Sequence, residues 1–342
     1  MKHISILIGL ILLLVLAGCG ITHTNLGGSP GDSAPAATEA VQPKEAVPVK
    51  ENSSTAIVNK TITHEMGTFT LNKTPERVVY LFAGAVDIGV ALGVKPVGAV
   101  ESVDQKPWFR YLGSTMNGVK SLGEESQPNI EAIIALKPDL IIATKVRHEK
   151  IYPQLSSIAP TIVTKDLADW KVNIKLMADA LNKQEAEATI IADWNTRIAG
   201  FKQKMGDKLS TTEVSIIRFE KDNSAKFYVT GFPGLIIKEL GLPIPKAQQI
   251  EGLTGSGVNL ISKEHIPQLD GDYIFDITTQ LPDQKNTLQY QQEWITHPIW
   301  KDLKGVKNGK YFKVDPITWN LGGGALAAKL ILDDLYTHFG IQ

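Results

Sequence analysis

The chain has 342 residues, of which 43% are hydrophobic and 21% are charged, and its formal net charge is −1. This length allows two domains with sizeable cores, and the composition argues against a wholly disordered chain. The almost balanced charge provides no strongly basic face, so we expect no nucleic-acid partner. The single cysteine excludes an intrachain disulfide bond.

The first residues have the pattern of a secretion signal. A short basic start precedes an apolar run, residues 4–16, which ends in the string LAGC at residues 16–19. This run is shorter than the roughly 20 residues that a membrane-spanning helix needs. The string resembles a bacterial lipobox, which predicts a signal peptide over residues 1–18 and a diacylated Cys19. An uncleaved anchor, or a signal peptide with an unrelated cysteine, are the alternatives.

Residues 19–55 are predicted to be a lipidated, disordered tether. They are rich in Gly, Ser, Pro, Ala and Thr and contain few large apolar side chains. Such a segment cannot bury enough apolar surface to offset the entropy lost on ordering. The expected arrangement is a globular part held on the extracytoplasmic face of the cell membrane by a lipid anchor.

From residue 77 onward, short apolar stretches alternate with helical patterns. The expected strands are residues 77–82, 96–100, 139–144, 161–164, 214–219, 226–229, 273–277 and 311–314. The expected helices are residues 85–92, 129–136, 149–158, 233–240 and 325–339. This alternation predicts an α/β fold with two lobes, each a mostly parallel sheet flanked by helices.

An internal similarity also favours two lobes. Residues 131–142 align with residues 264–275 at a constant offset, although chance similarity of two helix–strand units is an alternative. The segment 184–208 lacks proline and predicts one long helix, which would be a stiff connector. We therefore expect an N-terminal lobe (56–183) and a C-terminal lobe (209–342), with a ligand cleft between them.

These features together resemble the helical-backbone class of periplasmic-type binding proteins, of the ferric hydroxamate or citrate type. The resemblance covers about residues 60–342. It rests on the order of several strings: PERVV at 75–79, ALGVKPVG at 91–98, QPNIE at 127–131 and LKPDLII at 136–142. It implies a monomeric solute-binding lipoprotein and not an enzyme. Its role would be to capture a ferric siderophore and deliver it to the permease dimer of an ABC importer.

A ferric siderophore already surrounds its iron with oxygen ligands, so we expect no metal-ligating side chains, no cofactor and no catalytic residues. A planar guanidinium can donate several hydrogen bonds to those oxygens. Arg147 follows an expected strand, Arg218 lies within one, and Trp319 follows a third, so we expect all three to line the cleft. A solvated arginine, a structural ion pair and a core tryptophan are the alternatives. Weaker candidates for the same aromatic wall are Phe82, Trp108, Tyr228 and Phe232.

Two glutamates occupy matching places in the internal similarity. Glu131 and Glu264 each lie in the first turn of a predicted helix, after the N-cap candidates Asn129 and Ser262. Attraction to the helix dipole alone could explain them. The resemblance implies instead that one acidic residue of each lobe docks on the permease.

Other functions fit the sequence less well. The histidines are scattered, which disfavours a zinc- or manganese-binding lipoprotein, and no Gly-x-Ser-x-Gly motif supports a secreted hydrolase. An adhesin or sensor without a small ligand, and a receptor for vitamin B12 or haem, remain alternatives. The glycines at 322–324 lack the Lys-Ser/Thr ending of a phosphate loop and are expected to form a flexible entry to the last helix. Few basic residues cluster in the expected cleft, which favours a hydroxamate or mixed citrate–hydroxamate chelate over a trianionic catecholate.

Overall fold

The computed structural model describes residues 59–341. The signal peptide, Cys19 and the tether lie outside the described residues. Within residues 59–341, no helix combines the length and the apolar character needed to cross a membrane.

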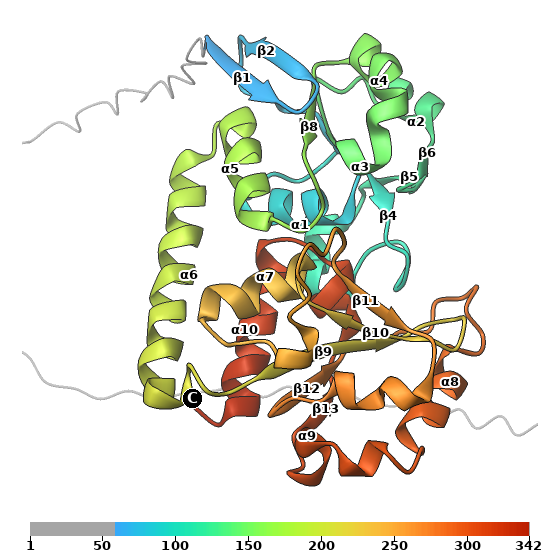
Figure 1. The fold of residues 1–342 in the computed structure, drawn as a ribbon. Helices are drawn as coiled ribbons and strands as arrows, with labels where there is room; N and C mark the ends of the chain where they lie inside the picture. The colour runs from blue at the N-terminus through green and yellow to red at the C-terminus, as the bar shows by residue number, and fades with distance from the viewer. Residues whose placement is uncertain (1–58, 342) are drawn as a thin grey trace, which may run out of the picture. The chain divides into compact units, whose positions relative to one another are not determined.

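A six-stranded sheet organises the first half of the described chain (Figure 1). Its strand order is β6-β5-β4-β3-β7-β8, and all neighbours pair in parallel except β5 and β6. Its strands are β3 (Val78–Tyr80), β4 (Gly98–Glu101), β5 (Lys120–Glu124), β6 (Gln127–Pro128), β7 (Leu140–Thr144) and β8 (Thr161–Thr164). Every residue of β7 is buried, as expected for a parallel strand covered on both faces.

Helices and one hairpin complete this half. The helices are α1 (Ala83–Ala91), α2 (Ile130–Ala135), α3 (Lys145–His148), α4 (Tyr152–Ile158) and α5 (Trp170–Leu181). A separate antiparallel hairpin, β1 (Lys60–His64) with β2 (Gly67–Leu71), packs beside α5 and β8. The hairpin, β5, β6 and α5 were not expected from the sequence.

A five-stranded sheet organises the second half, in the order β11-β10-β9-β12-β13. Its strands are β9 (Val214–Phe219), β10 (Ala225–Tyr228), β11 (Gly257–Leu260), β12 (Tyr273–Asp276) and β13 (Tyr311–Lys313). Strands β9, β12 and β13 are parallel to one another, whereas β10 is antiparallel to both of its neighbours, β9 and β11. The sheet is therefore mixed rather than mostly parallel, because a short turn joins β9 to β10 and allows only antiparallel pairing. Its helices are α7 (Gly231–Leu240), α8 (Thr287–Ile295), α9 (Lys304–Lys307) and α10 (Ala325–Phe339).

In sequence, one long helix, α6 (Gln184–Met205), comes after the last strand of the first sheet and before the first strand of the second (Figure 1). It buries Trp194, Ile198, Phe201 and Met205, which recur at helical spacing on one face. The α-helix ends three residues earlier than predicted because Gly206 has a φ of 53°, and residues 206–208 form a 3-10 turn.

The internal similarity corresponds to a shared structural detail. Asp139 accepts a hydrogen bond from the backbone N–H of Arg77 (2.8 Å), which precedes β3. Asp272 accepts one from the backbone N–H of Glu213 (2.9 Å), which precedes β9. In each sheet an aspartate thus ties the start of one strand to the start of its parallel neighbour. The two units differ in the preceding helix, which is α in α2 but 3-10 in Lys263–Leu269.

The two halves are joined by a buried carboxylate. Asp87 on α1 is fully buried and accepts hydrogen bonds from the backbone N–H groups of Leu326 (2.8 Å) and Ala327 (3.0 Å) at the start of α10. The Tyr111 hydroxyl donates a third hydrogen bond (2.9 Å) to Asp87. The carboxylate therefore caps the last helix from the first one. Burial nevertheless raises the pKa of Asp87 to about 6, because removal from water outweighs the three donors.

This cap explains the glycines that precede α10. A Cβ on Gly324 would lie 2.3 Å from Oδ1 of Asp87, and Gly323 has a φ of +65°. The expectation of a flexible entry to the last helix is therefore wrong. Glycine is required at Gly324 because Asp87 of α1 lies too close for a Cβ, and at Gly323 because its φ is positive.

The substitution Asp87→Ala should lower the free energy of unfolding by about 2–4 kcal/mol, because it leaves two buried backbone N–H groups without an acceptor. Chemical denaturation of the purified protein measures this effect. Asp193→Ala, which removes an exposed aspartate of α6, should change the value by less than about 0.5 kcal/mol. Equal stabilities of the Asp87 variant and the wild type would show that the carboxylate is not a structural link.

Candidate functional site

One pocket is lined by the segments that follow one strand of each sheet, β4 and β13, and by α10. The pocket has a volume of ≈ 390 Å³. Gln105 and Arg110 reach it from the segment after β4, and Asp315 and Thr318 reach it from the segment after β13. Ligands of α/β proteins bind beyond the carboxyl ends of strands, so the residues that follow these strands are candidates for ligand contact.

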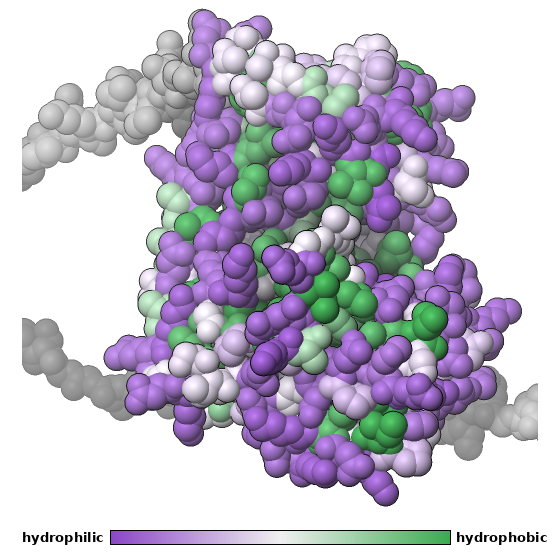
Figure 2. All heavy atoms as spheres, in the orientation of Figure 1, coloured by the Kyte–Doolittle hydropathy of each residue, from purple (hydrophilic) through white to green (hydrophobic). Residues whose placement is uncertain are grey.

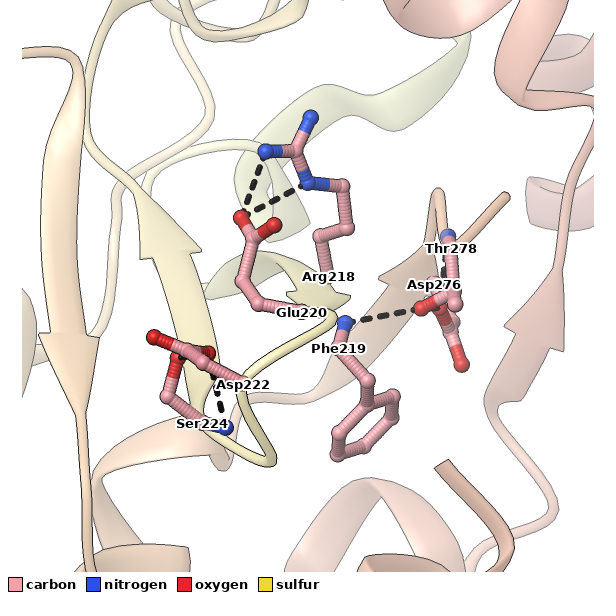
Figure 3. Close-up of polar contacts among 7 residues, drawn as sticks. All are labelled: Arg218, Phe219, Glu220, Asp222, Ser224, Asp276 and Thr278. Carbon is pink, nitrogen blue, oxygen red and sulfur yellow. Dashed lines mark hydrogen bonds and ion pairs between the residues drawn. The ribbon is translucent and has the colours of Figure 1, made fainter. Parts of the chain in front are cut away.

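The second sheet contributes a cationic and aromatic patch at its edge. Arg218 of β9 and Lys226 of β10 are direct partners across the two strands. The Tyr228 ring lies on the same face, with its centroid 5.7 Å from Cζ of Arg218 and 4.8 Å from Nζ of Lys226. Arg218 also forms an ion pair with Glu220, whose carboxylate accepts a hydrogen bond from Nε (2.8 Å) (Figure 3). We call Arg218, Lys226, Tyr228 and Glu220 the cationic patch.

Two like charges opposite each other across a strand pair destabilise a sheet. Burial, and secondly the charge of Arg218, lower the pKa of Lys226. Such a local conflict is typical of a functional site, where a bound anion relieves it. Sequence reasoning missed Lys226. The signal was a charged residue in an expected strand, as for Arg218, but the pairing of the two strands could not be read from the sequence.

The first sheet places Arg147 on α3, directly after β7. Arg147 is half-exposed and forms an ion pair with Glu125 (Nε to Oε1, 3.2 Å). The other oxygen of Glu125 accepts a hydrogen bond from the backbone N–H of Ala83 (3.1 Å), in the first turn of α1. Glu125 is therefore held by a helix terminus as well as by the arginine.

A buried histidine positions Glu125. The backbone N–H of Thr144 donates to Nδ1 of His148 (3.1 Å), so Nε2 carries the proton and donates to the carbonyl oxygen of Glu125 (2.9 Å). Burial lowers the pKa of His148, which favours this neutral form. His148 thus orders the segment that holds Arg147.

The aromatic candidates differ in accessibility. Trp319 is fully buried, stacks on Phe275 and donates a hydrogen bond from Nε1 to Asp334 (2.8 Å). Phe82 is also fully buried in the core. Neither side chain is exposed to a ligand in this structure, because both fill the space between packed elements. Phe232 is buried on α7, whereas Trp108 is half-buried and reachable.

Exposed aliphatic groups add apolar contact area near the strand ends. Val146 lies beside Arg147 and is 58% exposed, and Val103, which follows β4, is 46% exposed. Hydrophobic side chains surface in patches among hydrophilic ones on the face drawn in Figure 2. Apolar surface beside cationic groups suits a ligand with both characters.

A larger pocket, ≈ 470 Å³, lies between α5 and α7. Lys171 and Glu239 form an ion pair in its wall (2.7 Å), and Nε1 of Trp194 donates to the same oxygen of Glu239 (3.0 Å). Lys171 and Glu239 thus pair with each other, whereas no carboxylate of the described residues pairs with Lys226 of the cationic patch. We therefore place the candidate site at the strand ends, despite the smaller volume there.

The two candidate docking glutamates are both exposed. Glu131 lies in the first turn of α2, which Asn129 caps by accepting a hydrogen bond from Ala132 N–H. Glu264 lies in the 3-10 turn that Ser262 caps. Within the described part of the chain, neither forms an ion pair. The same part contains no group of three or more His, Cys, Asp or Glu residues that could hold a metal ion.

Comparisons with known proteins give consistent results. The probable siderophore-binding lipoprotein YfiY of Bacillus subtilis is 41% identical over 301 residues, which cover 84% of this chain and 91% of that protein. The achromobactin-binding periplasmic protein of Dickeya dadantii is 34% identical, with 78% of this chain and 87% of that protein covered.

Among solved structures, Staphylococcus aureus SirA complexed with staphyloferrin B matches with a TM-score of 0.77 and 38% identity. The match covers 83% of this chain and 99% of that one. The family model described as periplasmic binding protein matches residues 78–318, which include both sheets and the long helix between them. The chain belongs to this family of periplasmic binding proteins.

Proposed function

We propose that the protein captures a ferric siderophore outside the cell membrane and delivers it to an ABC importer. The cationic patch carries the proposal, because it places Arg218, Lys226 and an aromatic ring on one face at the carboxyl edge of a sheet. Such a patch binds the negatively charged oxygens of a chelate. Relatives whose names refer to siderophore binding support the same ligand class.

The proposed ligand is an anionic chelate that carries carboxylates. An arginine fork and a lysine suit carboxylate oxygens better than the uncharged oxygens of a neutral ligand. Of the two chelates expected from the sequence, the mixed citrate–hydroxamate type fits this patch better than a purely hydroxamate chelate. Iron would be held by the siderophore alone, with no resident cofactor.

We further propose that the ligand lies between two lobes, residues 56–183 and 209–342, with Arg147 on one wall and Arg218 on the other. Helix α6 would join the lobes as a stiff connector. The cap that Asp87 provides for α10 would hold the strand ends of the two lobes at a fixed distance. A monomeric receptor of this kind needs only small movements to enclose its ligand.

Delivery requires contact with a membrane partner. Glu131 and Glu264 are exposed, lie in matching units of the two lobes and are free of ion pairs within residues 59–341. We propose that each docks on a cationic group of one permease subunit. Exposed charges of this kind act on encounter and register, and their effect weakens with salt.

The ligand-binding prediction concerns the two arginines. Arg147→Ala and Arg218→Ala should each weaken binding of a ferric siderophore about tenfold, because each removes charged hydrogen bonds worth about 1.5–3 kcal/mol. Quenching of tryptophan fluorescence by a panel of ferric siderophores, vitamin B12 and haem provides the measurement. Arg197→Ala serves as a control, since Arg197 of α6 pairs with Asp333 of α10. Unchanged affinity in both cleft variants would exclude their assigned roles.

The docking prediction concerns uptake rather than binding. The double variant Glu131→Ala with Glu264→Ala should bind the siderophore normally but abolish iron uptake when it is the only receptor in the cell. The double variant Glu185→Ala with Asp193→Ala removes the same charge from exposed positions of α6 and should transport normally. Normal uptake by the first variant would contradict the docking role.

The anchoring prediction concerns Cys19. The lipobox string predicts that the mature protein begins at a diacylated Cys19, so Cys19→Ala should remain unprocessed. Mass spectrometry of the N-terminal peptide from the membrane fraction tests this. A mature, membrane-bound Cys19→Ala protein would show that the chain is anchored in another way.

A further inference from the structure

We infer that Glu220 is an internal competitor for Arg218, and that a carboxylate of the ligand must displace Glu220 before it can accept hydrogen bonds from both Nε and Nη2 of the arginine. The inference rests on the proposed function and assigns a role in ligand selection to one residue. Nε and Nη2 of Arg218 both donate to the same oxygen of Glu220. The bidentate side of the guanidinium that Nε and Nη2 form is therefore already occupied.

The position of Glu220 is built by the turn between β9 and β10. The N–H of Glu220 donates to the carbonyl oxygen of Ser224 (2.9 Å), and the carboxylate of Asp222 accepts hydrogen bonds from the backbone N–H (3.2 Å) and hydroxyl (2.6 Å) of Ser224 (Figure 3). Nε1 of the buried Trp294 donates to the carbonyl oxygen of Asn223 (3.1 Å). These bonds hold the turn in one conformation, so the glutamate is held beside the arginine.

The backbone between the two partners is also fixed. The N–H of Phe219 donates to Oγ1 of Thr278 (2.8 Å), and Thr278 in turn donates to the buried carboxylate of Asp276 (Figure 3). Tyr311 and Gln291 donate further hydrogen bonds to Asp276. Arg218 and Glu220 therefore flank Phe219, whose backbone is held by this hydrogen bond. Exchange of a ligand for Glu220 would thus involve the side chains of Arg218 and Glu220.

The charges of the patch do not cancel. No carboxylate of the described residues pairs with Lys226, so Arg218, Lys226 and Glu220 leave one positive charge in excess. A small anion with one negative charge gains little binding free energy from this single excess charge, and Glu220 repels it at close range. A chelate with several carboxylates can engage Lys226 and still replace Glu220 at Arg218. Glu220 thus raises the number of negative charges that a ligand needs.

The corresponding glutamate of the first lobe differs. Glu125 also pairs with an arginine, but its second oxygen accepts the backbone N–H of Ala83. Displacing Glu125 would leave the backbone N–H of Ala83 without an acceptor. Glu220 has no second partner among the described residues, and it is therefore the one that can yield to a ligand.

The test compares Glu220→Gln with the wild type, using ferric citrate and iron-free citrate as probes and the chelate that quenches most strongly in the panel. Glu220→Gln should bind these anions about three- to tenfold more tightly, because a neutral amide oxygen competes for the donors of Arg218 more weakly than a carboxylate does. The same variant should unfold about 1–4 °C lower, because Arg218 and Lys226 then face each other without a counter-ion. A purely structural glutamate would lower stability without any gain in binding.

Two further variants make the result specific. Asp302→Asn removes the carboxylate of another ion pair in the same half, with Lys307, and should leave anion binding unchanged. In an Arg218→Ala background, Glu220→Gln should give no gain, because Glu220 acts through the arginine. Equal or weaker binding by Glu220→Gln, or a gain that persists without Arg218, would overturn the inference. A wild type that binds no ferric chelate at all would instead contradict the proposed function.

Discussion

The capping of the last helix by a carboxylate of the first is the contact on which the arrangement of this protein depends. Asp87 is fully removed from water, yet both of its oxygens are used by donors of the opposite half. The close approach of α1 to the start of α10 requires glycine at Gly324, and a positive φ favours glycine at Gly323. α10 follows β13 by a short segment, and the segments after β4 and β13 line one pocket together with α10.

The cationic patch destabilises the sheet in which it lies. Arg218 and Lys226 oppose each other across two strands, and only one carboxylate accompanies them. The surrounding hydrogen bonds, from Asp276 through Thr278 to the backbone of Phe219, keep this unfavourable pair in place. In the proposed site the backbone would stay in place, and only the ion pair between Arg218 and Glu220 would have to break to receive a negatively charged chelate.

Much of the fold could be predicted from periodicity, because β8, β9 and α10 begin and end where their apolar patterns do. The mixed second sheet and the partner of Arg218 could not, because the pairing of strands depends on turns and on contacts distant in sequence. The burial of the aromatic side chains could not be predicted either. The position of Trp319 after a strand suited a cleft wall, but this side chain stacks on Phe275 in the core.

The position of iron in a complex tests the account most directly. Crystals of the protein grown with the ferric chelate that binds it can be measured at the iron absorption edge, where the anomalous signal locates the metal. The account predicts one iron beside Arg218 and Lys226, held by chelate oxygens and not by side chains. An iron site in the pocket between α5 and α7, or one ligated directly by protein carboxylates, would contradict it.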